Sequence, residues 1–427
     1  MRPLYFPILV TALLIPSTTI VGQTQESTEA EIIRMSLLPD APNVHSETHQ
    51  EIIAWLTNFQ RVVLRMKVQE FINLTDWDEF VKRAVESSGV TLNAEQSKLI
   101  RQAMMTYNAR LFPQVREFYL FAEAEIRRID VNEDEATVVA RIYGADGTEF
   151  KARWWLHKDG PVWRMVDFEN LTVAIRMSVM VTMGLELGES GTKLPPSTAG
   201  DFVEMGAAAQ EGEFERVVAI SEKLQDLPLP PSIIEIVLLA KLEALFGLDD
   251  DEGVADLVAK LEEKNCANPL YFYYRGQISY LDGQLSEALR WLQEYDRAVG
   301  HDSETWPTAF ECLIETGDRK SARQAAARWV SEYPDSVYGI YCYWSVMRKN
   351  RRAEVIRPLL MKVPDPDNSL LEFGIEAEYA DDVDGLDLLI DVMTQRKCDP
   401  NSIRDFSDSL DAARKARKMR KNSDPED

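Results

Sequence analysis

The chain has 427 residues, and its 47 lysines and arginines against 71 aspartates and glutamates give a formal net charge of −24 and a pI near 4.7. So large an acidic excess repels phosphate backbones, which argues against nucleic-acid binding. Hydrophobic residues make up 45% and charged residues 28%, a composition that excludes a disordered or fibrous chain and, at this length, predicts two or three folded units.

Residues 1–22 have the layout of a secretory signal peptide. Arg2 precedes a short apolar stretch bracketed by Pro7 and Pro16, and small polar residues follow. The stretch is shorter than the ~20 residues that span a bilayer. We therefore expect a secreted or periplasmic protein with no transmembrane segment after signal cleavage.

Residues 23–46 are polar and predict a linker that leads into a folded domain over residues 47–190. Apolar residues recur at three- and four-residue steps from Ser46 or Glu47 onward, which predicts a long amphipathic helix. Further helices are expected over residues 75–89 and 93–111, the latter ending before Pro113.

Between residues 118 and 168 the apolar period changes to two, which predicts about four antiparallel strands. Turns are expected at residues 132–134, 145–147 and 158–160. In the third strand, one face is predicted to be core and the other wetter. The first face carries Phe150, Ala152, Trp154 and Leu156, and the second carries Lys151, Arg153, Trp155 and His157. An apolar helix over residues 172–187 should close the domain.

The end of this domain resembles a known family. The segment from Trp163 to Leu171 is similar to the last strand of the MlaC/toluene-tolerance periplasmic proteins and of related NTF2-like domains, through Trp163 and Asp167. The resemblance implies a curled sheet around a helix, and lipid carriage as an alternative function. An apolar hollow under such a sheet would be lined by Phe150, Trp154, Leu156 and Phe168.

Residues 191–200 read as a second linker, and residues 201–413 read as helical repeats. Turn-like residues recur with steps of 35, 36, 34 and 33 residues, at Gly212, Gly247, Gly283, Gly317 and Asn350. This spacing, and the pattern Gly317, Ala322, Ala326 and Pro334, is similar to tetratricopeptide repeats. The expected fold is an α+β N-terminal domain with helices and a curled antiparallel sheet, followed by an all-α tetratricopeptide-like solenoid.

The four cysteines have no zinc or redox-dithiol spacing. Cys312 and Cys342 lie 30 residues apart and could form a disulfide between stacked helices, but buried free thiols are the favoured interpretation. The tail over residues 414–427 is first basic and then acidic, typical of a helix end whose cations suit the dipole. Attachment of its cations to an anionic surface is the alternative.

No catalytic, cofactor-binding or metal-binding set can be assembled from the sequence. His45 and His49 have the spacing of a helical metal pair, but the intervening Glu47 is not where a metalloprotease needs it, so residues at a helix start are expected. The run from Asp249 to Glu252 is expected to be a solvated turn rather than a cation site.

Aromatic clusters on the first helices of repeats are the candidates for partner contact, since rigid aromatic side chains are favoured interface anchors. The candidates are Tyr271, Tyr274, Tyr338, Tyr341, Trp344 and, on the wetter sheet face, Trp155. Because a stacked-helix array exposes a long groove, we expect an exported, non-enzymatic adaptor that binds a protein partner. A lipid or small-ligand carrier is the first alternative, and an unfamiliar or degraded enzyme is the second.

Overall fold

The computed structural model describes residues 35–37, 46–65, 67–88, 91–119, 123–143, 149–171, 175–179, 181, 195, 197–229, 231–300 and 303–423. The predicted signal peptide lies outside these residues. The chain divides into two compact units. Unit 1 contains residues 1–278 and 293–301, and unit 2 contains residues 279–292 and 302–427.

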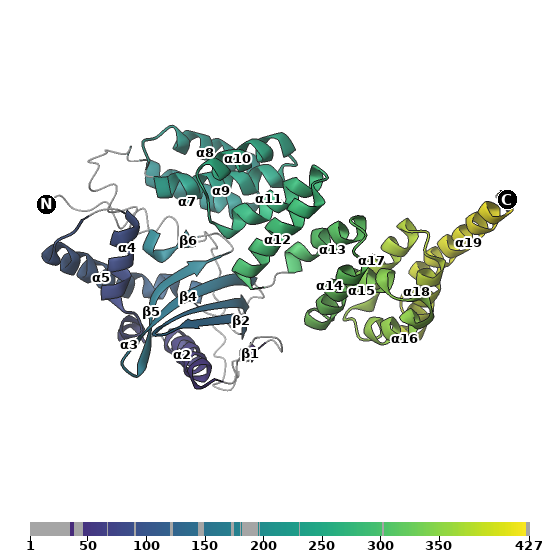
Figure 1. Cartoon of the computed structure of the whole chain (residues 1–427), viewed down its shortest axis with the longest axis horizontal. Helices are drawn as coiled ribbons and strands as arrows, with labels where there is room; N and C mark the ends of the chain where they lie inside the picture. Colours follow the sequence, from purple (N-terminus) through teal and green to yellow (C-terminus); the bar gives the residue numbers. More distant parts are fainter. Residues whose placement is uncertain are drawn as a thin grey trace. The chain divides into compact units, whose positions relative to one another are not determined.

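Four helices cover one face of a sheet in unit 1 (Figure 1). They are α2 (Glu47–Leu64), α3 (Val68–Asn73), α4 (Trp77–Ser88) and α5 (Ala94–Tyr119). The predicted start at Ser46 is confirmed, because its side chain accepts a hydrogen bond from the His49 amide at 3.3 Å. Asn93 and Gln96 form a reciprocal capping box. The predicted end of α5 is wrong, since the helix continues through Pro113 to Tyr119.

The sheet has six strands in the order β1-β2-β3-β4-β5-β6. Strands β2 (Glu123–Asn132), β3 (Glu135–Tyr143), β4 (Glu149–Asp159) and β5 (Val162–Asn170) form the predicted antiparallel meander. At the edges, β1 (Met35–Leu37) pairs in parallel with β2, and β6 (Ile175–Arg176) pairs with β5.

The segment that follows β5 differs from the predicted helix. Residues 175–176 form a strand where a helix starting at residue 172 was expected, and helical residues begin at 177. The rest of the expected helix, and the turn at residues 145–147, lie outside the described residues. The last turn is centred on Gly160, which takes a left-handed conformation at φ 60°.

From residue 197 onward, the described residues are mainly helical and form successive hairpins (Figure 1). Those of unit 1 are built from α7 (Thr198–Glu211), α8 (Phe214–Gln225), α9 (Pro231–Gly247) and α10 (Asp251–Glu263). The next pair, α11 (Pro269–Leu281) and α12 (Leu285–Val299), contributes to both units. Unit 2 continues with α13 (Trp306–Glu315), α14 (Arg319–Glu332), α15 (Val337–Val346), α16 (Lys349–Leu360), α17 (Pro366–Tyr379), α18 (Val383–Arg396) and α19 (Pro400–Ser423).

Three of the five predicted turn residues adopt the left-handed conformation that glycine tolerates, namely Gly212, Gly283 and Gly317. Gly247 instead ends α9, where a Cβ would lie 2.5 Å from the Phe214 ring, so it is needed for close helix packing. The turn after α9 uses Asp249, and Asp250 caps α10. Asn350 is inside α16, because the turn before it runs through Met347 in an extended conformation.

All four cysteines are free and buried, as the favoured interpretation predicted. Burial raises the pKa of the Cys266 thiol to about 12, of Cys312 to about 11 and of Cys342 to about 12. Because the thiolate is the reactive form, a raised pKa lowers the reactivity of the thiol at neutral pH.

We expect dithionitrobenzoate at pH 8 to react rapidly with no thiol of the native protein and with four thiols after denaturation. One rapidly reacting thiol in the native protein would contradict this prediction.

Among the helices that the structure describes, none is both long enough and apolar enough to cross a bilayer.

Candidate functional site

Three of the aromatic residues expected to contact a partner are buried in the helical hairpins. Tyr271, Tyr274 and Trp344 are 3%, 6% and 1% exposed. Tyr274 packs on Phe246 with ring centroids 5.2 Å apart, and the Trp344 indole donates to Asp382. Neighbouring side chains of the chain therefore already cover the rings of these three residues.

Trp155 is half-buried on the second face of the sheet, where cations of the chain cover its ring. The guanidinium of Arg176 lies 4.1 Å from the ring centroid and that of Arg153 lies 5.4 Å away. Arg176 also pairs with the fully buried Asp167 at 2.5 Å. Trp155 is thus part of an internal cation–π arrangement rather than an open anchor.

The second face of the sheet, predicted to be the wetter one, packs against α11 and α12 within unit 1. Val139 and Leu171 form a small core with Tyr295 and Val299. Lys151 donates to the Tyr295 hydroxyl at 3.1 Å, and Arg153 donates to the Ala298 carbonyl at 2.7 Å. Cations suit this position because the carbonyl end of a helix is its negative end.

The side chains proposed to line an apolar hollow are core residues instead. Trp154, Leu156 and Phe168 are 2%, 0% and 7% exposed, and all three belong to the core between the sheet and α2–α5. The Trp154 and Phe168 rings lie 5.6 Å apart. The side chain of Phe150 lies outside the described residues. The hydrophobic residues of α2, α3 and α4 occupy the space assigned to a ligand.

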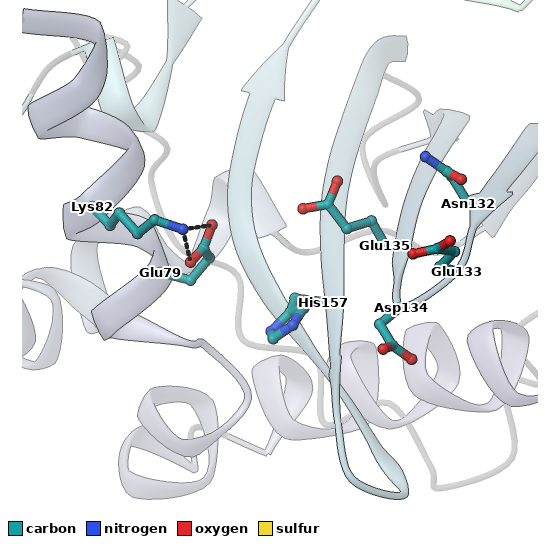
Figure 2. Close-up of a pocket in the computed structure, with 7 residues that line it drawn as sticks. All are labelled: Glu79, Lys82, Asn132, Glu133, Asp134, Glu135 and His157. Atoms are coloured by element: carbon teal, nitrogen blue, oxygen red, sulfur yellow. Dashed lines mark hydrogen bonds and ion pairs between the residues drawn. The ribbon is translucent and has the colours of Figure 1, made fainter.

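A polar pocket lies beside the turn between β2 and β3 (Figure 2). Its lining is Glu79, Lys82, Asn132, Glu133, Asp134, Glu135 and His157. His157 is 3.4 Å from Asp76, and Lys82 is paired with Glu79 at 3.1 Å. Figure 2 shows the carboxylates of the turn pointing in different directions. Within the described residues, no group of three or more potential ligands is placed to hold a metal ion.

His49 of the histidine pair and Asp250 of the acidic run have partners within the chain. His49 is buried, and its ring approaches Ser46 and the Ile129 carbonyl. His45 lies outside the described residues. Asp250, in the acidic run, accepts a hydrogen bond from the Gly253 amide at 3.0 Å and so caps α10.

The remaining aromatic candidates, Tyr338 and Tyr341, lie on a partly open surface of unit 2. We call this surface the tyrosine–carboxylate face. It comprises Tyr280 of α11, Glu311 and Glu315 of α13, Tyr338 and Tyr341 of α15, and Glu372 and Glu376 of α17. Each helix is the first of its hairpin, and each contributes side chains to the same surface.

Helical spacing places these side chains on one side of each helix. Glu311 and Glu315, like Glu372 and Glu376, are four residues apart and therefore lie on one helix face. In α15 the buried side carries Val337, Ile340 and Trp344, which pack in the unit 2 core. Tyr338 and Tyr341 lie at the margin of this buried side and are half-buried, because their rings pack on Trp329 and Phe373 with centroids 5.6 Å and 5.3 Å apart.

Glu311 sits between two tyrosines from neighbouring hairpins. The Tyr280 hydroxyl donates to one carboxylate oxygen at 2.6 Å, and the Tyr338 hydroxyl donates to the other at 3.2 Å. Hydrogen bonds to an ionised acceptor are stronger than those between neutral groups. The pair therefore holds the Glu311 carboxylate in a fixed orientation across the face.

Several titratable groups of this face have raised pKa values. The hydrogen bond to Glu311 raises the pKa of Tyr280, and burial followed by nearby acidic groups raises that of Tyr338. Burial, with the repulsion of Glu372 and Glu311, raises the pKa of Glu376. Burial and Asp382 raise the pKa of Tyr341 to about 12. Burial is the largest cause of the shifts of Tyr338, Tyr341 and Glu376, and the nearby carboxylates act in the same direction.

Within the described parts of the chain, none of Glu311, Glu315, Glu372 and Glu376 forms an ion pair with a lysine, arginine or histidine. The aspartates of α18 differ, since Asp384 pairs with Arg352 at 2.5 Å and Asp387 with Arg414 at 2.7 Å. Exposed apolar side chains adjoin the acidic residues, with Ile375 60% and Tyr379 93% exposed on α17.

Sequence reasoning found the two tyrosines of this face but missed its carboxylates. The available signal was the four-residue spacing of the acidic pairs on two first helices. That signal could not separate these carboxylates from the many acidic residues that are paired or solvated elsewhere.

No protein-family model matches this chain, and no curated protein shows significant sequence similarity to it.

Proposed function

We propose that the protein is an exported, non-enzymatic adaptor that binds a partner protein on the tyrosine–carboxylate face of a tetratricopeptide-like array. The observation that carries this proposal is the un-neutralised, partly open face built from the first helices of successive hairpins. Aromatic side chains are enriched at protein-binding surfaces, and charged groups beside them select a partner of complementary charge.

The packing of the hairpins supports the tetratricopeptide-like part of the proposal. Ala322 and Ala326 are fully buried where α14 meets its neighbours. A Cβ at Gly339 would lie 3.0 Å from the Trp329 ring, so α15 approaches α14 closely at that point. Small residues at helix crossings and large ones in the gaps are what a stacked repeat array requires.

A site-directed cross-linking experiment tests the proposal. A photoreactive benzoylphenylalanine in place of Ile375 would report on the face, and the same residue in place of Val355 would be the control. Val355 is 37% exposed on α16, a second helix. In the cell that makes the protein, we expect one identifiable partner to be cross-linked at position 375 and not at 355. Equal labelling at both positions, or labelling at 355 alone, would contradict the assignment.

Deletion of the whole array would be a poorer test. Val139 and Leu171 pack against Tyr295 and Val299, so removing residues 201–413 would expose apolar surface of the sheet. A loss of binding in such a truncated chain could then reflect misfolding of unit 1 rather than loss of the face.

A further inference from the structure

We propose that the tyrosine–carboxylate face takes a basic segment of the partner, one in which lysine or arginine side chains alternate with apolar ones. This inference rests on the proposed function and deepens it by assigning the chemistry of the partner.

The face is negatively charged. Four carboxylates from α13 and α17 gather there, and no described cation of the chain neutralises any of them. Glu311 accepts hydrogen bonds only from the Tyr280 and Tyr338 hydroxyls among the described residues. Each carboxylate oxygen has two acceptor sites, so both oxygens retain capacity for a further donor. An ammonium or guanidinium group supplies that donor together with the missing positive charge.

Aromatic and apolar side chains lie beside the carboxylates. Tyr338 and Tyr341 pack edge-on against Trp329 and Phe373 and remain half-exposed, so the exposed part of each ring can contact the apolar stem of a basic side chain. Ile375 and Tyr379 lie four residues apart on α17 and expose apolar surface beside Glu372 and Glu376. Lysine and arginine carry long apolar stems that pack on such surface while their charged ends reach carboxylates.

The charge of the face disfavours acidic partners. A phosphorylated or acidic segment would be repelled by the four carboxylates and would leave them unpaired in a partly desolvated interface. The chain has a basic helix end of its own, where Lys415 and Lys418 are exposed and without an ion pair among the described residues. Occupation of the face by that helix end of a second copy is an outcome that the test separates.

The test uses the full chain and two fluorescein-labelled peptides. One peptide alternates lysine with leucine and alanine, and the other has glutamate in place of each lysine. Fluorescence anisotropy would measure the dissociation constants for the unchanged protein, for Glu311→Gln/Glu376→Gln, and for the control Glu252→Gln/Asp256→Asn. The control residues are exposed on α10 and form no ion pair with a described residue, and both variants remove two negative charges.

We expect the basic peptide to bind the unchanged protein and the acidic peptide not to bind. Glu311→Gln/Glu376→Gln should weaken binding about tenfold or more, because two charge-assisted contacts are lost, whereas the control should change it less than about twofold. An equal loss in both variants would show attraction to net charge alone and overturn the proposal. Unchanged melting temperatures of both variants would show that they fold.

A further variant tests whether the basic helix end of a second copy occupies the face. If Lys415→Gln/Lys418→Gln abolishes a concentration-dependent dimer and frees the face for tighter peptide binding, the occupant is a second copy, and the proposal is overturned. Cross-linking of a partner at position 375 together with unchanged binding by Glu311→Gln/Glu376→Gln would leave the adaptor function standing and remove only this inference.

Discussion

Asp167→Ala is expected to destabilise unit 1 by about 2–3 kcal/mol, because it removes a fully buried carboxylate that accepts charge-assisted hydrogen bonds. The Asp167 carboxylate is fully buried and accepts hydrogen bonds from the Arg176 side chain at 2.5 Å and from the Ser178 amide at 3.1 Å. Alanine would leave the amide unsatisfied and the Arg176 guanidinium without its counter-charge. Chemical denaturation followed by the far-ultraviolet circular dichroism of the sheet would measure the loss.

Asp159→Ala is the matched control. Asp159 is also paired with an arginine, Arg164 of β5, but at 3.6 Å and with a side chain that is 66% exposed. An exposed pair of this kind contributes less than about 1 kcal/mol. The double variant Asp167→Ala/Arg176→Met should be less destabilised than the sum of the single variants, because the uncompensated charge disappears. Similar small losses for Asp167→Ala and Asp159→Ala would refute the role assigned to the buried pair.

Asp167 and Trp163, the residues behind the family resemblance, have structural roles in this chain. Together with Trp163, it was the residue through which the last strand resembled periplasmic lipid-carrier domains. In the structure, Asp167 fixes the segment after β5 to the sheet, and the Trp163 indole donates to Glu51 of α2 at 3.1 Å. Both residues hold the fold together. A motif of this kind therefore predicts a sheet and its closure without predicting a ligand.

The sequence allowed the elements of both regions to be predicted where local chemistry decides them. Gly212, Gly283 and Gly317 are turn residues because a left-handed backbone favours glycine wherever it occurs. Ser46 and Asn93 begin helices because their side chains accept hydrogen bonds from backbone amides that are otherwise unpaired in the first turn. These effects involve residues within four positions of one another, so a single sequence reveals them.

The errors arose where contacts between distant residues decide the outcome. Gly247 had the spacing of a turn, but Phe214 requires a small residue at that point of α9. The charged face of β4 suggested exposure to water, whereas α12 covers it and supplies acceptors for Lys151 and Arg153. Likewise, whether Glu311 pairs with a cation depends on which helices lie beside α13, and the spacing of residues along one helix does not contain that information.

Gly300→Ala is expected to destabilise unit 1 by about 3 kcal/mol, because steric conflict adds to backbone strain. Gly300 follows α12 with φ 75°, and a Cβ there would lie 2.6 Å from the Arg127 Cβ and 3.2 Å from the Val139 side chain. The nearest of these atoms is fixed to the backbone of β2 and cannot turn away. The end of α12 must therefore move away from the sheet, which would weaken the Lys151 and Arg153 contacts. Denaturation would measure the loss.

Gly212→Ala separates strain from steric conflict. Gly212 has nearly the same conformation, with φ 70°, and lies in the same unit, but nothing approaches within 4 Å of an added Cβ. We expect that variant to lose only about 1 kcal/mol, the ordinary cost of a left-handed alanine. Hydrogen exchange should show faster exchange of the last turn of α12 in Gly300→Ala alone. If the two variants lose the same stability, then backbone strain accounts for both, and close contact between α12 and the second face of the sheet is not what requires glycine at position 300.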